Sequence, residues 1–283
     1  MTGLRIIAVA IPAVGAVAAA IAFGAYRGAM REAERAWSSV AAGAQPSGEV
    51  FDPASVRELP EIARRYFNHA IAAGTPLKSV IELEMQGTFV LGDKDSPQVY
   101  AMTARQILRP PLNFVWIPQM KSGLMRISGS DALVDGAGWS RFWLLGLVPV
   151  ANVRGGSDVA RSAAFRSAIE SIWVPPSLLP ANKVIWEQTG KNTARVRLQR
   201  VDPEIVLDLT LAADGGVRKI VGQRWSNANP KGVFKLQPFG GSVAAERSFG
   251  GYTIPSSLEV GNHFGTEDYL PFFRAEIVSA AFH

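Results

Sequence analysis

The sequence predicts a mainly β protein of the α+β class, built from one large, curved antiparallel sheet that forms a half-open β-barrel. About eleven short segments alternate apolar with polar residues, and hairpin-length turns join most of them. One helical segment is inserted midway along the chain. Because helices do not alternate regularly with strands, a parallel α/β sheet is not expected.

The N-terminal segment, residues 1–28, is predicted to be a membrane anchor. Residues 6–26 are uncharged and lie between Arg5 and Arg27, a length that matches a helix crossing ~30 Å of hydrocarbon. A cleavable signal peptide would have a shorter core and a small-residue cleavage site, which Ala22-Phe23-Gly24 matches poorly. We therefore expect an uncleaved, single-pass helix in the cytoplasmic membrane.

The orientation of this anchor follows from two opposing features. A plain count of basic residues places the C-terminal side in the cytoplasm, because Arg27, Arg31 and Arg35 follow the run. The short tail that carries Arg5 favours the opposite orientation, and Glu32 dilutes the positive charge after the run. We expect the body on the extracytoplasmic, periplasmic side.

The rest of the chain is predicted to be a linker region and one domain. Residues 29–50 are expected to form a short polar helix that frays into a linker, and residues 51–283 a single β-rich domain with a helical cap. A helix is expected from Asp52, its N-cap, to Gly74, with Pro60 kinking or splitting it. Strands are expected over 79–91, 98–108, 112–117, 124–136, 138–145, 183–190, 193–201, 204–212, 216–226, 233–239, 243–264 and 272–282.

The composition excludes several classes of function. The net charge is +5, but the basic residues are scattered singly, whereas nucleic-acid binding needs a clustered basic face. The absence of cysteine excludes disulfides, thiol catalysis and cysteine-ligated zinc. No phosphate-binding loop or dinucleotide fingerprint is present, so no cofactor is expected.

Few residues offer catalytic or metal-binding chemistry. His263 lies close in sequence to Glu267 and Asp268, which leaves a hydrolase using His263 as a weaker alternative, although a polar turn explains the same residues. Asp131 and Asp135 share one side of a predicted strand, and a solvated face is the default interpretation. We assign no catalytic residue and no metal ligand.

The most informative segment is residues 139–180. Arg141 to Leu145 continue an alternating strand, and Gly146 and Pro149 are expected to release the chain into a crossover that leads to a capping helix, residues 157–173. Arg166 and Glu170, spaced i, i+4, are expected to pair, and Pro176 follows the end of the helix. The apolar face of this helix must pack either on a solid core or over a ligand cavity.

We expect a cavity for a hydrophobic ligand, such as a lipid or a lipoprotein acyl chain, between this helix and the concave sheet. The alternative is an envelope protein–protein interaction module with a solid core and an unknown protein partner. The residues expected to line the cavity are Trp143, Leu145, Leu147, Val150, Phe165, Ile169, Trp173 and Leu178.

The same segment resembles a family of uncharacterised bacterial proteins. That family shows the pattern LLGLVPVA, a glycine-containing turn, a helix with Arg, Glu and Trp, and a closing P-x-x-LLP. These elements correspond here to Leu144–Ala151, Gly155-Gly156, Arg166, Glu170, Trp173 and Pro176–Pro180. The resemblance extends over about residues 57–278, and it implies no activity.

One departure from the family and one further similarity concern the cap. Residues 163–169, AAFRSAI, stand where the family has a bulkier apolar run, so this helix face is lighter here. The predicted architecture is also similar to the LolA/LolB-like lipoprotein carriers, half-barrels that bind acyl chains. This similarity implies an acyl-binding function.

Overall fold

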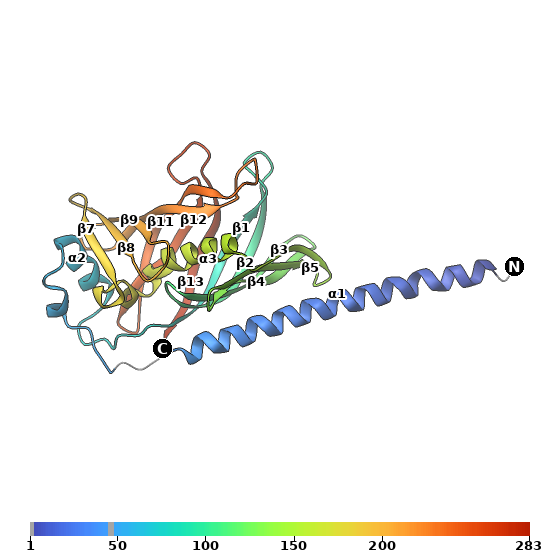
Figure 1. Cartoon of the computed structure of the whole chain (residues 1–283), viewed down its shortest axis with the longest axis horizontal. Coiled ribbons are helices and arrows are strands. Elements are labelled where there is room, and N and C mark those ends of the chain that lie inside the picture. Colours follow the sequence, from blue (N-terminus) through green and yellow to red (C-terminus); the bar gives the residue numbers. More distant parts are fainter. Residues whose placement is uncertain (1–2, 45–47) are drawn as a thin grey trace.

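A computed structural model describes residues 3–44 and 48–283 of the chain, with side chains from residue 16 onward (Figure 1). Its described part contains one antiparallel sheet of 13 strands. The strands are β1 (Ile81–Leu91), β2 (Gln98–Arg109), β3 (Asn113–Ser122), β4 (Met125–Val134), β5 (Ala137–Leu144), β6 (Val148–Arg154), β7 (Val184–Gln188), β8 (Thr193–Leu198), β9 (Ile205–Leu211), β10 (Val217–Ser226), β11 (Lys235–Phe249), β12 (Tyr252–Asn262) and β13 (Leu270–Phe282).

The helical elements are fewer. They are α1 (Gly3–Ala42), α2 (Glu61–Ala70), α3 (Ser157–Ile169) and the 3-10 turns η1 (Pro53–Val56), η2 (Glu170–Trp173), η3 (Pro175–Leu178) and η4 (Pro180–Asn182). Pro60 divides the predicted helix after Asp52 into η1 and α2, which is one of the two outcomes expected at that position. The predicted helix over 157–173 consists of α3 followed by η2.

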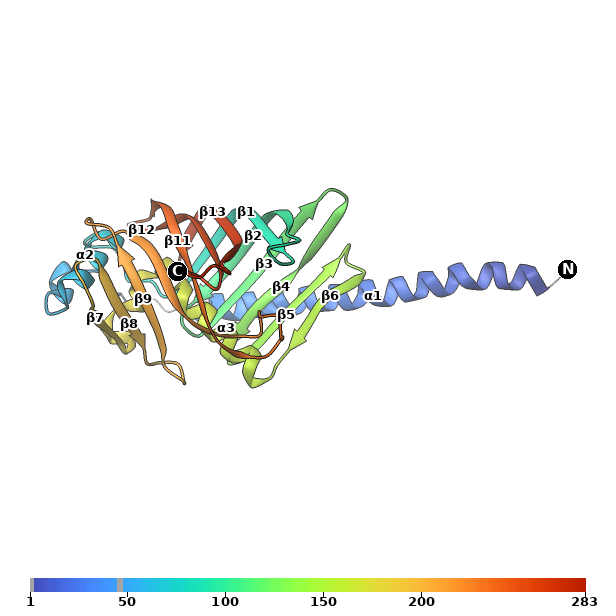
Figure 2. The ribbon, with the colours of Figure 1, turned by 90° about the horizontal axis from the view of Figure 1, so that it is seen from above.

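The sheet is an open, curved meander whose order explains the position of α3. The strands follow the order β6-β5-β4-β3-β2-β1-β13-β12-β11-β10-β9-β8-β7, so that β6 and β7 are opposite edges. The segment between these two edges contains α3 and the turns η2 to η4, and α3 lies inside the curve of the sheet (Figures 1 and 2). The inserted helix thus connects the two edges across the concave face.

The predicted crossover after Leu145 is wrong, because residues 148–154 form β6 and pair with β5. Leu145 and Gly146 have positive φ values of 54° and 69°, and the Leu147 N–H donates to the Leu144 carbonyl at 3.0 Å. Two central residues with positive φ are typical of a type I′ hairpin turn, in which glycine is favoured. The second strand of this hairpin, β6, is absent from the twelve predicted segments, and residues 235–249 form one strand, β11, where a break was predicted between 239 and 243, so that the sheet has 13 strands.

Alternation along each strand assigns its side chains to two faces. In β1, Ile81, Leu83 and Met85 are buried, whereas Glu84 and Gln86 between and after them are exposed. The buried side chains belong to the main core on the concave side, which α3, η2 and η3 complete. The predicted alternation of this strand is confirmed.

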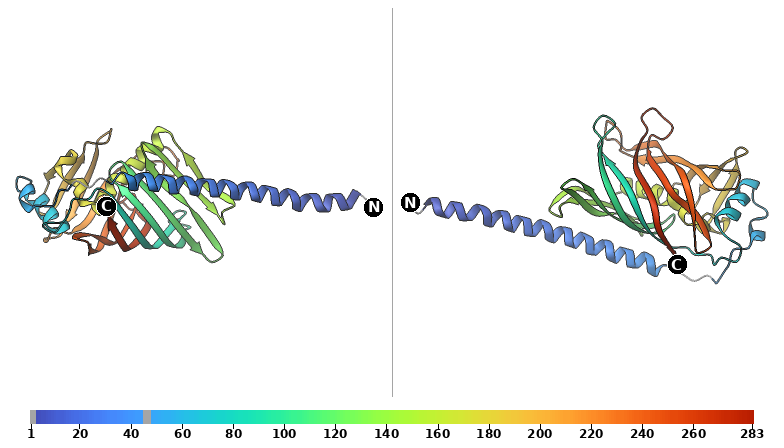
Figure 3. Two further views of the ribbon diagram at one scale, coloured as in Figure 1. Left: turned by 90° about the horizontal axis from the view of Figure 1, so that it is seen from below. Right: turned by 180° about the vertical axis from the view of Figure 1, so that it is seen from behind.

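Helix α1 covers the outer face of the first half of the sheet. Its C-terminal part lies across β2 to β5, and its N-terminal part projects beyond the body (Figures 1 and 3). Ala33 and Val40 pack into a second, smaller core with Val115 and Trp139. Glu32 accepts hydrogen bonds from Arg141 at 2.9 Å and Arg154 at 2.6 Å. The expected short helix after residue 29 is therefore the docked end of one longer helix.

Most of the predicted membrane anchor falls on the projecting part of α1, but its C-terminal end contacts the body, where the Tyr26 ring meets Trp143 and the Tyr26 hydroxyl accepts from Ser128 Oγ at 3.1 Å. Among the residues that the structure describes, no helix combines the length and the hydropathy needed to span a bilayer. Residues 6–15 of the predicted span lie outside the residues whose side chains are described, as do residues 45–47 of the predicted linker. The anchor at 6–26 therefore stays a prediction.

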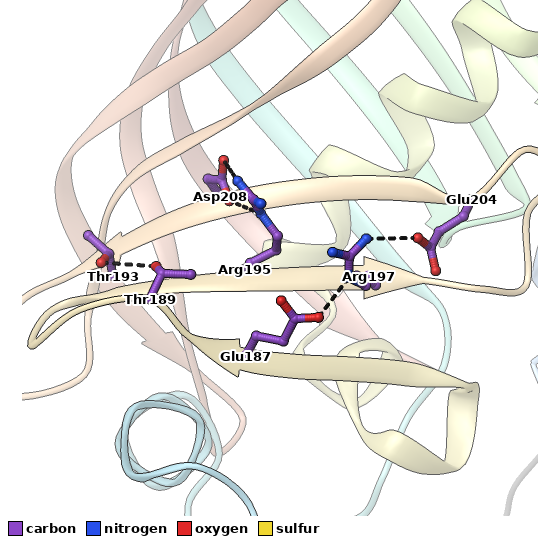
Figure 4. A network of polar contacts seen from close by, with 7 residues as sticks. All are labelled: Glu187, Thr189, Thr193, Arg195, Arg197, Glu204 and Asp208. Atoms are coloured by element: carbon purple, nitrogen blue, oxygen red, sulfur yellow. Dashed lines mark hydrogen bonds and ion pairs between the residues drawn. The ribbon is translucent and has the colours of Figure 1, made fainter.

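The outer face of the other half of the sheet carries ion pairs on β7 to β9 (Figure 4). Arg195 forms two hydrogen bonds with Asp208, which lies directly opposite on β9, at 2.8 and 3.0 Å. Arg197 bridges Glu187 and Glu204 at 2.7 and 3.1 Å. On the inner side of the same strands, Trp186 packs against Tyr66 and Phe67 of α2.

Candidate functional site

The concave face holds a cavity of ≈ 390 Å³ between α3 and the sheet. This volume lies within the roughly 300–1,000 Å³ of small-molecule sites. Strands β1, β3 to β6 and β10 to β13 contribute to its wall, together with α3 and η2. The lining is mainly apolar and rich in aromatic side chains, namely Phe89, Trp116, Phe142, Trp173, Phe239, Phe272 and Phe273. The helix and the sheet therefore do not fill each other completely.

A close approach of α3 to β10 fixes one side of this cavity. A side chain at Gly222 would place its Cβ 2.8 Å from the Phe165 ring and 2.9 Å from the Val206 carbonyl oxygen. Phe165 in turn meets Phe239 edge-on, with the ring centroids 5.8 Å apart. Glycine at 222 thus lets α3 rest on one wall of the sheet, while Arg166 reaches toward the other wall.

Arg166 connects α3 to the opposite wall through a partly buried charge cluster. Its Nε lies 2.9 Å from Glu170 Oε1, and its Nη1 forms an ion pair with Asp131 Oδ2. The guanidinium also lies over the rings of Phe114 and Trp116, at 4.6 and 5.0 Å from their centroids. Desolvation lowers the pKa of Arg166, but the two carboxylates outweigh it and hold that pKa above its ordinary value. Arg166 is therefore charged and satisfied.

A second arginine, Arg224 of β10, lines the same cavity in a different environment. Its Nε donates to Ser162 Oγ at 3.1 Å, and its guanidinium lies 4.9 Å from the Phe239 ring centroid. Within the described part of the chain, no carboxylate lies within 4.0 Å of its nitrogens. Burial lowers the pKa of Arg224 to about 10. Because this pKa is still above neutral pH, Arg224 stays protonated there.

The predicted lining residues fall into three groups. Val150, Ile169 and Trp173 line the cavity, together with Arg166 and Glu170 of the predicted pair. Phe165 of α3 is buried against β10 and β11 without forming the cavity wall. Leu178 and Pro176 are buried in η3 and do not line the cavity either.

The remaining predicted residues lie elsewhere. Trp143 is on the outer face of β5, where its ring meets Tyr26 of α1 at a centroid distance of 5.6 Å. Leu145 and Leu147 are exposed in the β5–β6 turn. Phe142 and Ser140, its neighbours of opposite parity, face the cavity in place of Trp143. Ligand contacts of the eight residues stay a prediction.

The sequence did not predict two charged residues of the cavity wall, Asp131 and Arg224. Asp131, expected on a solvated face, instead points into the cavity and pairs with Arg166. Arg224 carried one recognisable signal, because it follows Ile220 and Gly222 at every second position of an inward-facing row. A charged side chain at such a position is rare unless it has a partner or a ligand.

The histidines do not assemble a catalytic group in the described residues. His263 lies in a turn with φ +58°, and its Nε2 is 3.1 Å from the Ala228 carbonyl oxygen. No hydrogen bond or ion pair joins it to Glu267 or Asp268 there, and no cluster of potential metal ligands is present in that part of the chain.

His69 of α2 forms the clearest titratable contact away from the cavity. Its Nε2 lies 3.0 Å from Glu246 Oε2, and the other oxygen of Glu246 accepts from the Val217 N–H at 3.0 Å. The hydrogen bond to Glu246 raises the pKa of His69. This pair ties α2 to β10 and β11, outside the cavity.

A comparison with protein families identifies the chain. Residues 49–275 match a family of unknown function, DUF6544, and the chain belongs to this family. No curated protein sequence matches it.

Three solved structures are similar to the chain at low identity. The first is a LolA superfamily protein from Nitrosomonas europaea, with 7% identity and a TM-score of 0.40 over 78% of this chain and 92% of that one. The second is a putative outer membrane lipoprotein-sorting protein domain from Vibrio parahaemolyticus, with 11% identity and a TM-score of 0.38 over 72% and 85%. The third is a DUF1329 family protein from Desulfovibrio piger, with 9% identity and a TM-score of 0.37 over 82% and 94%.

Proposed function

We propose that this member of a family of unknown function binds a lipid-like hydrophobic ligand in the cavity under α3. The observation that carries the proposal is an apolar, aromatic-lined space of ≈ 390 Å³ at the centre of the concave face. An apolar ligand that enters it leaves water, and each buried methylene contributes about 0.8 kcal/mol. Affinity should therefore rise about fourfold per methylene and stop rising when the chain exceeds the cavity.

The experiment combines native mass spectrometry with ligand uptake. We expect lipid to co-purify with the chain, and a fluorescent fatty acid to bind with an affinity that depends on chain length. Ala151→Trp places a large ring at the wall of the cavity and should abolish uptake. Asn152 is an exposed neighbour on the same strand that does not line the cavity, so Asn152→Trp should leave uptake unchanged. A protein free of lipid that takes up no fatty acid would contradict the proposal.

We further propose that the N-terminal helix holds this binding domain at the cytoplasmic membrane, with the body on the periplasmic side. The uncharged run 6–26 and the projection of α1 beyond the body support it (Figure 3). So do two exposed hairpin tips: Leu124 at the β3–β4 turn is 91% exposed, and Leu145 is 57% exposed. Leu145 also has a positive φ, a conformation that costs a non-glycine residue about 1–3 kcal/mol.

The β5–β6 tip lies beside the projecting part of α1. A Cβ at Gly146 would lie 3.2 Å from the Tyr26 ring and 3.7 Å from the Phe23 ring. Apolar side chains at such a tip would enter the interface of a membrane that α1 crosses. Because Val150 and Ala151 of β6 line the cavity, a ligand could pass from the bilayer along this edge.

A further inference from the structure

The cavity has an unequal distribution of charge. Arg166 is engaged by both Asp131 and Glu170, and Glu170 also accepts from Gln106. Glu259, another lining residue, pairs with Arg274 at 3.2 Å. Among the described residues, the carboxylates of the cavity wall therefore all have a cationic partner.

Arg224 has no such partner. Its hydrogen bond to Ser162 uses one of the five N–H groups of the guanidinium, and the structure describes no further hydrogen bond from its Nη atoms. These atoms are not sealed in the protein interior either, since they are absent from the set of buried polar atoms that lack a partner. Arg224 thus combines a fixed orientation, set by Ser162 and the Phe239 ring, with a fork of donors that remains available.

A second donor in the wall is also unused. Trp116 is 2% exposed, and its indole Nε1 is buried without a hydrogen-bond partner in the described structure. An indole N–H can only donate. A ligand in the cavity that supplies acceptor oxygens would satisfy the free Nη donors of Arg224, whereas the Trp116 Nε1 is sealed from the cavity in this structure.

We propose that Arg224 binds the anionic headgroup of an amphiphile, a carboxylate or a phosphate, whose hydrocarbon chain occupies the apolar part of the cavity. This inference rests on the proposed function and narrows its ligand class from hydrophobic compounds to anionic lipids. A planar guanidinium matches both headgroups, because two parallel N–H groups can bind two oxygens of either one. Neutral acyl esters and alcohols lack this interaction.

The test compares probes that differ only in the headgroup. The purified full chain is titrated with dodecanoate, dodecyl phosphate and dodecanol, and binding is followed by calorimetry and by tryptophan fluorescence. In the wild type, one or both anions should bind about 10- to 100-fold more tightly than the alcohol, the range of one charge-assisted hydrogen-bonded contact. The anion that gains more identifies the headgroup.

The variants separate recognition from a structural role. Arg224→Gln should remove the preference for the anion and leave dodecanol binding unchanged. Lys219→Gln, on the exposed face of the same strand, removes the same charge and should change neither affinity. Arg224→Lys should retain part of the preference, since it keeps the charge but loses the fork.

Three results would overturn the inference in distinguishable ways. Equal affinity of the wild type for all three probes would refute the headgroup site and leave the hydrophobic cavity intact. An equal loss of all three probes in Arg224→Gln would assign Arg224 a purely structural role. Absence of binding by any probe, dodecanol included, would refute the proposed function and the headgroup site together.

Discussion

Replacement of Arg166 by methionine should destabilise the protein strongly, because it leaves two carboxylates without their cation. At an effective dielectric constant of 20, one ion pair at 4 Å has a Coulomb energy of about 4 kcal/mol, so that the two pairs of Arg166 amount to roughly 8 kcal/mol before desolvation. Measured losses on breaking one buried pair are about 3–5 kcal/mol. We expect a decrease of about 3–5 kcal/mol in the free energy of unfolding at pH 7.

The same reasoning predicts the rescue of this variant. The triple variant Arg166→Met, Asp131→Asn and Glu170→Gln leaves no unpaired charge among these three residues, and it should recover to within about 2 kcal/mol of the wild type. Methionine also keeps part of the packing over Phe114 and Trp116, where the cation contributed about 0.5–1 kcal/mol per ring. Urea unfolding followed by tryptophan fluorescence measures these differences.

Two results would refute the argument. One is a loss below about 1 kcal/mol in Arg166→Met, and the other is a triple variant as unstable as the single one.

Three further predictions concern other parts of the molecule. The hydrogen bond to Glu246 raises the pKa of His69. The stability that this pair contributes should therefore be present below pH ~6.5 and be lost as the pH rises through the folded-state pKa, and urea unfolding midpoints across pH 5.5–8.5 measure this loss. Gly222→Ala should lower the free energy of unfolding by about 1–3 kcal/mol, because its methyl group would meet the Phe165 ring. Leu124→Ser should weaken binding to lipid vesicles in a flotation assay without changing the unfolding midpoint, because Leu124 is 91% exposed.

Matched variants control these three predictions. His69→Gln should flatten the pH profile, and an unchanged profile in this variant would exclude His69 as its origin. Gly28→Ala, a helical position with nothing within 4 Å, should be neutral or stabilising, in contrast to Gly222→Ala. Val99→Ser, another exposed apolar position, should leave vesicle binding unchanged, and equal loss in both variants would contradict a specific role of the β3–β4 tip.

The fold class was predictable because the alternation of apolar and polar residues along a half-buried strand shows which of its side chains are buried. The alternation of Ile81, Leu83 and Met85 with polar residues defines β1 without knowledge of any partner strand. Strand β6 was missed for the converse reason. It is an edge strand that is exposed along nearly its whole length, so no period of burial marks it, and only its hydrogen bonds to β5 define it.

The residues that line the cavity could be predicted only in part. The sequence located Ile169, Trp173 and the Arg166–Glu170 pair on the capping helix, since helical spacing places them together. It could not locate Asp131 as the second partner of Arg166, because residues 35 positions apart meet only through the curvature of the sheet.

By itself, then, the sequence determined the elements that depend on neighbouring residues: the alternating strands, the turns between them and the apolar face of the capping helix. The tertiary structure decided which face of each strand is concave. Phe142 and Trp143 are adjacent and both aromatic, yet Phe142 lines the cavity and Trp143 packs against α1. The pairing of β1 with β13 and the docking of α1 decide which side chains of β5 face the cavity. The same choice turns Arg224 inward and leaves Lys219 in solvent. Alternation is a local property of a strand, whereas the direction of curvature depends on pairings between residues nearly two hundred positions apart.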